Sequence, residues 1–223
     1  LVTPNSTVSA RAGWPPRAYH QAAVLDGKLY VFGGGNYVPE YAALNDVWAS
    51  EDGVNWTQMT EAAPWHPRLW FSSAVYRDRM WVIGGWSNNP SKNWDDVWYS
   101  KDGATWTQVR PNTFGTDAFN PKTEWAGCHT AGYVIYKNKM WIIGGDAIQG
   151  NYPSDVWNSE DGIAWTHVNE GHDAPWGPRV LHHTVVFNDA IWIMGGQTTP
   201  QFAPAEERFY DDIWNTADGV EWT

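Results

Sequence analysis

Four short apolar runs, each ending in a pair of glycines, recur along the chain. They read KLYVFGG from Lys28, RMWVIGG from Arg79, KMWIIGG from Lys139 and AIWIMGG from Ala190. Runs of this length, rich in β-branched and aromatic residues and closed by glycine, are typical of strands buried on both faces. Another apolar run precedes each of them, separated from it by two residues; these runs are QAAVL, SSAVY, GYVIY and HTVVF. Two-residue connections rich in Asp, Asn and Gly predict a tight β-hairpin at each place.

A polar and aromatic segment after each glycine pair supplies the other half of the unit. It reads NDVWASEDGVNWT from Asn45, DVWYSKDGATWT from Asp96, SDVWNSEDGIAWT from Ser154 and DDIWNTADGVEWT from Asp211. The central Asp-Gly predicts a turn, because Asp can accept hydrogen bonds from nearby backbone amides and Gly can take positive φ. The residues on either side predict two more strands. Each unit of about fifty residues is therefore expected to be a four-stranded antiparallel meander.

One sheet of this kind cannot bury both of its faces, so the units are expected to stack around an axis as blades of a β-propeller. The predicted fold is all-β, one propeller over residues 1–223. Its blades are expected at approximately 14–59, 65–109, 125–168 and 176–223. Residues 1–13 either complete an outer strand of the last blade and close the ring, or belong to a propeller that continues in a longer chain.

Two tryptophans recur in every unit at a constant spacing. The pairs are Trp48/Trp56, Trp98/Trp106, Trp157/Trp165 and Trp214/Trp222. Aromatic side chains carry the most burial per residue, and neighbouring blades fan apart, so we predict that these rings fill the space between blades instead of binding a ligand. An aspartate also repeats in every unit, which favours a structural role over a catalytic one; these residues are Asp46, Asp96, Asp155 and Asp212.

Each unit has a glycine pair after a hydrophobic strand, followed by an aromatic position and a tryptophan. In this the sequence resembles the kelch-repeat family, which includes the central propeller of galactose-oxidase-like proteins. The SxDGxxWT hairpin also looks like a shortened Asp-box turn of sialidase-like propellers. Kelch units often have Tyr at the first aromatic position, where all four units here have Trp. The resemblance implies four-stranded blades and, most often, an interaction module. Kelch propellers usually have six or seven blades and this chain encodes four, so additional blades or self-association are expected.

The charge of the chain narrows the class of partner. The formal net charge is -11 and the pI is about 4.9. This balance is the opposite of that expected for a nucleic-acid binder or for binding to an anionic membrane, and no apolar run is long enough for membrane insertion. Eighteen tryptophans with abundant Gly and Pro are common in secreted, polysaccharide-facing proteins, so an extracellular or cell-surface location is expected.

The loops after the glycine pairs and between the blades are long and differ from blade to blade. Variable loops on a rigid scaffold usually carry binding, so we expect the ligand at this long-loop face. The aromatic candidates are Tyr37, Trp86, Trp94 and Phe119. Exposed rings beside Asn, Asp and Gln suit the stacking and hydrogen bonding of sugars. The alternative is that these aromatics only pin their own loops.

The segment that opens each inner strand supplies further candidates. It reads WPPRAYH from Trp14, WHPRLWF from Trp65, WAGCHTA from Trp125 and WGPRVLH from Trp176. Equivalent positions hold Arg17, Arg68 and Arg179, and also His20 and His182. Because inner strands surround the axis, the three arginines could converge on the central opening and bind an anionic ligand. In the alternative, each arginine pairs with a backbone carbonyl or an acidic neighbour.

The third unit departs from this motif, because Cys128 replaces the arginine and His129 follows it. Adjacent residues on a strand point to opposite faces, which disfavours a direct Cys–His pair and leaves a buried free cysteine as the simpler interpretation. No phosphate loop, metal motif or hydrolase motif is present in the sequence, so no metal or cofactor is predicted and catalytic residues remain undefined.

We therefore expect a binding propeller that engages a glycan or protein ligand through its long-loop face. The resemblance leaves two alternatives open. One is a carbohydrate-active enzyme, such as a sugar oxidase, a sialic-acid mutarotase or a sialidase-like protein. The other is a structural subunit of an extracellular assembly.

Overall fold

The computed structural model describes residues 12–36, 42–147, 152–198 and 208–223, and the regular structure in these ranges is entirely β. The first sheet has the order β1-β2-β3-β4. Its strands are β1 (Gln21–Leu25), β2 (Lys28–Phe32), β3 (Val47–Ser50) and β4 (Thr57–Thr60). The second sheet has the order β5-β6-β9-β10. Its strands are β5 (Ser72–Val75), β6 (Met80–Ile83), β9 (Val97–Ser100) and β10 (Trp106–Arg110).

The third and fourth sheets repeat this plan. The third has the order β11-β12-β13-β14. Its strands are β11 (Gly132–Tyr136), β12 (Lys139–Ile143), β13 (Val156–Ser159) and β14 (Thr166–His167). The fourth has the order β15-β16-β19, with strands β15 (His183–Phe187), β16 (Ala190–Met194) and β19 (Ile213–Thr216). Thr223 exchanges two backbone hydrogen bonds with Asn215 of β19, in the position of a fourth strand.

Two short hairpins lie in the loops that follow the glycine pairs of the second and fourth sheets. They are β7 (Trp86–Asn88) with β8 (Ser91–Asn93), and β17 (Gln197–Thr198) with β18 (Arg208–Phe209). They extend the loop side of these two sheets beyond the strand ends. Within the described ranges there is no helix whose length and hydrophobicity would let it cross a membrane.

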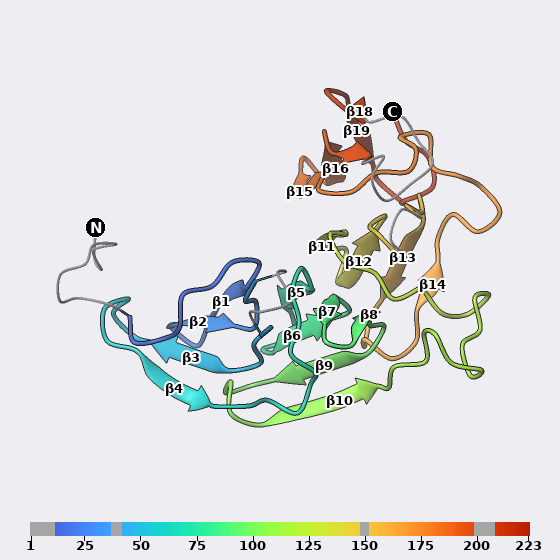
Figure 1. Cartoon of the computed structure of the whole chain (residues 1–223). Coiled ribbons are helices and arrows are strands. Elements are labelled where there is room, and N and C mark those ends of the chain that lie inside the picture. The colour runs from blue at the N-terminus through green and yellow to red at the C-terminus, as the bar shows by residue number, and fades with distance from the viewer. Residues whose placement is uncertain (1–11, 37–41, 148–151, 199–207) are drawn as a thin grey trace.

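The four sheets, called blades 1 to 4 in chain order, follow one another along an arc in Figure 1. Blade 1 lies at the left, blade 2 below the centre, blade 3 at the right and blade 4 at the top. The innermost strands contact one another in sequence, β1 with β5, β5 with β11 and β11 with β15. The predicted all-β architecture of four-stranded antiparallel propeller blades is confirmed.

The inner hairpins have the tight turns that the sequence predicted. In blade 1, Leu25 pairs with Lys28 across Asp26 and Gly27, whose φ values are 48° and 73°. Positive φ at both central residues defines the turn whose twist matches that of two antiparallel strands. The equivalent residues of the other blades also have positive φ; they are Arg77 and Asp78, Lys137 and Asn138, and Asn188 and Asp189.

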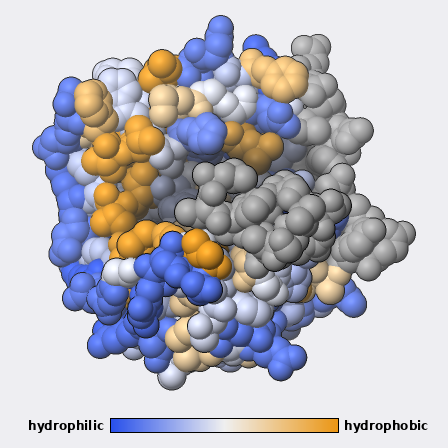
Figure 2. Space-filling view, turned by 90° about the vertical axis from the view of Figure 1, so that its left-hand side faces the viewer, coloured by the Kyte–Doolittle hydropathy of each residue, from blue (hydrophilic) through white to orange (hydrophobic). Residues whose placement is uncertain are grey.

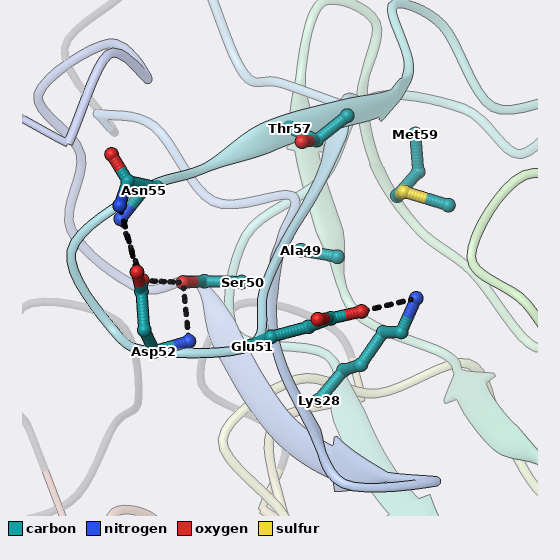
Figure 3. Close-up of a pocket in the computed structure, with 8 residues that line it drawn as sticks. All are labelled: Lys28, Ala49, Ser50, Glu51, Asp52, Asn55, Thr57 and Met59. Carbon is teal, nitrogen blue, oxygen red and sulfur yellow. Dashed lines mark hydrogen bonds and ion pairs between the residues drawn. The ribbon is translucent and has the colours of Figure 1, made fainter.

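The outer hairpins are closed by the repeated Asp-Gly turn (Figure 3). In blade 1, Oδ1 of Asp52 accepts hydrogen bonds from the backbone amides of Val54 at 2.8 Å and Asn55 at 2.7 Å. Ser50 Oγ accepts from the amide of Gly53 at 2.8 Å. Bonds from the Asn55 and Val54 amides hold the pKa of Asp52 well below its usual range. The same bonds recur around Asp102, Asp161 and Asp218.

The hydrophobic core is divided among the seams between neighbouring blades. The first seam joins Tyr30 and Phe32 of blade 1 to Trp65, Met80 and Trp106 of blade 2, and the next two seams repeat this composition. The second tryptophan of each later unit is buried in a seam and lies edge-on to the tryptophan that opens its blade. These pairs are Trp106 with Trp65, Trp165 with Trp125 and Trp222 with Trp176. The first tryptophans of these units also lie in the seams, Trp157 buried and Trp98 and Trp214 partly buried. The prediction that the paired indoles fill the space between blades is confirmed for blades 2 to 4, whereas Trp48 and Trp56 of blade 1 are only half-buried.

Candidate functional site

A chain of backbone hydrogen bonds crosses the blades where the inner strands begin. The amide of Trp70 donates to the carbonyl of Tyr19, that of Thr130 to Trp70, and that of Leu181 to Thr130, at 3.2–3.4 Å. All four residues have left-handed backbone conformations, with φ between 53° and 58°. That conformation is costly for bulky side chains, and structures keep it only where surrounding contacts enforce it. The blade-to-blade bonds therefore fix one side chain per blade at the loop face.

Three of the blades bring aromatic rings together at this point. We define the aromatic cluster as Tyr19, Trp70, Trp86 and His129. The ring of Trp70 is central, with centroid distances of 4.5 Å to Tyr19, 5.8 Å to Trp86 and 5.4 Å to His129. Trp70 and Trp86 are half-buried and Tyr19 is exposed. The cluster thus offers partly exposed aromatic surface on a scaffold of three blades.

A cavity of about 410 Å³ adjoins the aromatic cluster. Trp86 and His129 line one part of it, and the β7–β8 hairpin contributes Ser91 and Lys92. Phe114, from the loop between blades 2 and 3, also lines it. The cavity therefore combines apolar rings with an ammonium group and a hydroxyl, which is the usual composition of a binding pocket.

His129 is held in one orientation by the neighbouring hairpin. Its Nδ1 lies 2.9 Å from Oδ1 of Asn93, whose amide nitrogen donates to the carbonyls of Asp146 and Ala147. Since the Asn93 oxygen is an acceptor, Nδ1 carries the proton, and Nε2 lies 3.8 Å from Oδ2 of Asp146. Burial lowers the pKa of His129 to about 4, so the ring is neutral at physiological pH. The cluster accordingly carries no imidazolium charge.

The predicted loop aromatics have different surroundings. Trp86 belongs to the aromatic cluster and lines the cavity. Trp94 stacks on His66 at 4.7 Å, has the Lys92 ammonium 4.8 Å from its ring centroid, and donates from Nε1 to Ser87. Its ring is therefore engaged by Lys92 of its own loop and by His66 of the segment that opens blade 2.

The other two loop candidates lie apart from the aromatic cluster. Phe119 lies edge-on to Phe114 with centroids 5.2 Å apart, so it packs on a ring that lines the cavity without lining the cavity itself. Tyr37 lies outside the residues that the structure describes.

The three arginines are tied within their own blades. Arg68 makes two parallel bonds to Asp96, at 2.6 and 2.9 Å, and a third to the carbonyl of Gly84. Nε1 of Trp98 donates to the same carboxylate at 2.8 Å. Arg17 and Arg179 repeat this arrangement with Asp46 and Asp212, and the three guanidinium-bearing side chains are buried. The structure thus shows pairing with an acidic neighbour in place of convergence on a common opening.

The arginine tie of blade 4 shifts the ionisation of its partner. A hydrogen bond from Arg179, opposed by burial, lowers the pKa of Asp212 below its usual range. Blade 3 lacks the tie because Cys128 stands at the arginine position. There Asp155 lies 3.5 Å from His167, and His167 stacks on Trp157 with centroids 4.3 Å apart.

His20 and His182 occupy equivalent positions on the face that each blade turns toward the preceding one. His182 is buried against blade 3, and burial, assisted by the charge of Arg179, lowers its pKa to about 4. His20 belongs to the first blade and is half-buried; burial and Arg17 lower its pKa as well. Both side chains thus belong to blade faces and neither lines the cavity beside the aromatic cluster.

Cys128 is a buried free cysteine, as the simpler interpretation predicted. It belongs to the core between blades 2 and 3, and burial raises the pKa of its thiol to about 12. His129 points instead to the aromatic cluster, as expected for adjacent residues on an extended segment. Within the residues that the structure describes, no group of three His, Cys, Asp or Glu side chains is placed to hold a metal ion.

Two further cavities lie beside blade seams. One, of about 400 Å³, is shown in Figure 3 and is lined by Lys28, Glu51 and Met59 together with the Asp-Gly turn of blade 1. The other lies between the end of β10 and the Asp-Gly turn of blade 3 and includes Arg110, Glu124 and Trp165. Both are formed by repeated structural elements of the blades, which makes the cavity beside the aromatic cluster the better candidate site.

Sequence reasoning did not identify Tyr19 and Trp70 as site residues. The signal was present in the repeat, because each of these residues stands two positions after the arginine that recurs in units 1, 2 and 4. The equivalent positions in the other units hold Thr130 and Leu181. Aromatic residues at two of four equivalent positions would have pointed to a localised surface on blades 1 and 2.

Comparison with known proteins matches nearly the whole chain to one domain type. The family model described as the KLHDC2/KLHL20/DRC7 Kelch-repeats domain matches residues 5–196. A leucine-zipper-like transcriptional regulator 1 homolog from Drosophila melanogaster is 30% identical over 190 residues, which are 81% of this chain and 18% of that protein.

Two other relatives match shorter stretches. The flagellar outer arm dynein alpha chain of Chlamydomonas reinhardtii is 41% identical over 78 residues, covering 34% of this chain and 2% of its own length. The Kelch repeat protein M-T8 of Myxoma virus (strain Lausanne) is 31% identical over 83 residues, covering 35% and 15%. The chain thus spans less than a fifth of each of these relatives.

Proposed function

Because the chain belongs to the kelch-repeat family, whose domains generally serve as protein–protein interaction modules, we propose that it binds a segment of a partner protein at the long-loop face. The observation that carries the proposal is the aromatic cluster, which lies beside a cavity of about 410 Å³. Partly exposed tryptophans on a rigid scaffold are the residues that most often dominate the energy of protein interfaces.

The chemistry of the site indicates the kind of segment. Trp70 and Trp86 offer flat apolar surface, and the neutral ring of His129 adds a third ring to it. Lys92 supplies a cation at the rim of the cavity. A peptide with an apolar or aromatic anchor next to an acidic or hydrogen-bonding group would satisfy both parts of the site.

Selection of displayed linear peptides on the immobilised protein tests this proposal. Enriched peptides are titrated calorimetrically into the wild type and the Trp86→Ala variant. Loss of the Trp86 ring from the aromatic cluster should weaken binding by about thirtyfold, the effect of a hot-spot residue. Phe209→Ala is the matched control, because Phe209 is an exposed aromatic on β18 outside the aromatic cluster and should leave affinity unchanged.

The same variants decide between a protein and a glycan ligand. Sugars also stack on tryptophan, so an array of neutral and acidic oligosaccharides is probed in parallel. If a glycan binds in a way that depends on Trp86 and no enriched peptide does so, the ligand is a carbohydrate and not a protein segment. Peptides that bind wild type and Trp86→Ala equally would show that the aromatic cluster is not the binding site.

A further inference from the structure

Asp-Gly dipeptides form five turns of this chain, and one of the five differs from the other four. Four of them close the outer hairpins, at Asp52, Asp102, Asp161 and Asp218, and the fifth, Asp26-Gly27, joins β1 to β2. An aspartate followed by glycine can rearrange its own backbone, because no side chain shields the glycine nitrogen. The five turns differ in how far the fold permits this reaction.

The rearrangement has two steps and needs only water. In the first step, the glycine nitrogen loses its proton and bonds to Cγ of the aspartate, whose hydroxyl leaves as water, so that a five-membered imide closes. In the second step, water opens the imide at one of its two carbonyl carbons. Opening at the side-chain carbonyl restores aspartate. Opening at the backbone carbonyl leaves isoaspartate, whose main chain is longer by one methylene group.

The four outer turns keep both reacting groups occupied. In each of them the glycine N–H donates to the Oγ of a serine or threonine, here called the turn acceptor, at 2.8 Å. Oδ1 of the aspartate accepts two further backbone amides at 2.7–3.0 Å. Amide donors stabilise the ionised carboxylate, which is the less reactive form toward a nitrogen nucleophile. The outer turns are therefore protected at the nitrogen and at the carboxyl group.

The Asp26-Gly27 turn lacks these restraints. Among the described residues, no hydrogen bond or ion pair engages the Asp26 carboxylate, and the N–H of Gly27 has no acceptor. Both residues are exposed, and a Cβ on Gly27 would meet nothing within 4 Å. The turn is held at its ends, where Leu25 pairs with Lys28. Figure 2 views the molecule from the side on which blade 1 lies and shows hydrophilic residues along much of its outline, as expected where turns meet water.

A flip of one peptide plane brings the reacting groups of this turn together. The φ values of Asp26 and Gly27 are 48° and 73°, which define a type I′ turn. Rotation of the peptide plane between them gives a type II′ turn, whose first central residue has ψ of about −120°. At that ψ the glycine nitrogen eclipses Cβ of the aspartate, as a planar imide requires. Because glycine accepts both signs of φ and both turns suit a two-residue hairpin, the strands keep their positions.

We infer that Asp26 is the site at which this protein forms isoaspartate, and that the turn acceptors protect the four outer turns. The modification lengthens the main chain between Leu25 and Lys28. It also disturbs β2, which carries Tyr30 and Phe32 into the first seam. The inference is independent of the proposed ligand, since this turn lies at the end of β2 opposite to the glycine pair and the long-loop face.

Incubation of the folded protein at neutral pH in water enriched in oxygen-18 tests the inference. Opening of the imide places one oxygen-18 atom in either product, so mass spectrometry of proteolytic peptides reports every reaction, and electron-transfer fragmentation identifies isoaspartate. Label at Asp26 should exceed that at each outer turn by at least about tenfold, because an outer turn must first lose several hydrogen bonds. In urea the five sites should react at similar rates, since the difference comes from the fold.

Ser50→Ala removes the turn acceptor of blade 1 and provides the matched variant. It should raise label at Asp52 by about threefold and leave label at Asp26 unchanged. Thr216→Ala repeats this test at Asp218 and serves if Ser50→Ala does not give the circular dichroism spectrum of the wild type. Equal label at all five sites of the folded protein would overturn the inference. The same excess at Asp26 in urea would also overturn it, as would the absence of a gain at the turns that lack their acceptor.

Discussion

At the scale of single residues, a buried guanidinium bound to an aspartate and a glycine carbonyl ties each of three blades together. Arg68→Gln leaves the Asp96 carboxylate buried without its partner and should lower the free energy of unfolding by about 3–5 kcal/mol. Urea denaturation measures this loss. The control is Lys28→Ala, which removes an exposed ion pair with Glu51 and should cost less than about 1 kcal/mol. Equal costs for both variants would mean that burial of the arginine pair contributes nothing.

A second residue-scale prediction concerns the pH dependence of stability. The pKa of His182 falls from 6.5 in a free side chain to about 4 in the folded protein. Between these values the unfolded chain binds a proton that the folded chain does not. Stability from this residue is therefore complete above pH 6.5 and declines toward pH 4, by up to about 1.4 kcal/mol per pH unit.

His182→Phe isolates this contribution, because Phe71 occupies the equivalent position in blade 2. Unfolding by urea at pH 7 and pH 5 should show a larger loss for the wild type than for the variant. His129, which is also buried and neutral, accounts for part of the remaining loss. Identical losses in the two proteins would show that His182 does not titrate as the structure requires.

At the scale of elements, the Asp-Gly turn of one blade packs on the aromatic strand of the preceding blade. A Cβ on Gly103, whose φ is +76°, would lie 2.8 Å from the ring of Tyr30 in blade 1. Gly53 has the same place in blade 1 and a φ of +74°, but a Cβ there would meet Leu29 Cδ1 at 3.5 Å, an ordinary contact. Gly103→Ala should thus cost about 1–3 kcal/mol more than Gly53→Ala in thermal or urea unfolding, because only it overpacks a seam. If the two variants lose similar amounts of unfolding free energy, the loss comes from the strain of alanine at positive φ and not from overpacking of a seam.

Sequence periodicity predicted the elements well because the forces that specify them are local. Two-residue turns such as Asp26-Gly27 impose hairpin geometry, and Asp52 closes its turn through amides only two and three residues away. The aromatic cluster was not predicted, because Tyr19, Trp70 and His129 come from three blades and meet through packing between distant segments. Pairing of the arginines with a carbonyl or an acidic neighbour was foreseen in kind, but sequence spacing alone could not identify Asp96 as the partner of Arg68.

At the scale of the whole molecule, stability depends on the seams. Met80 is fully buried between blades 1 and 2, so Met80→Ala should cost about 2–5 kcal/mol through lost contacts and the cavity left behind. Leu29→Ala is the matched control at the same position of blade 1, where exposure should limit the cost to less than about 1 kcal/mol. If Met80→Ala lowers the free energy of unfolding only slightly, the packing between blades is not the main source of stability.

The acidic surface bears on partners of the whole molecule. With a net charge of -11, binding to nucleic acid remains disfavoured, and the expected extracellular or cell-surface location stays a prediction. The relatives that share the domain are much longer proteins with different names, from a dynein chain to a transcriptional regulator homolog. The kelch repeats thus occur in polypeptides with different names and lengths.

The left-handed residues at the start of the inner strands separate the requirements of folding from those of recognition. Amide-to-carbonyl hydrogen bonds join their backbones from blade to blade, and the four positions hold Tyr, Trp, Thr and Leu. Different side chains can therefore occupy these positions while the blade structure stays the same. Tyr19, Trp70, Thr130 and Leu181 are consequently the natural positions for a combinatorial library, from which one frame could yield binders of many targets.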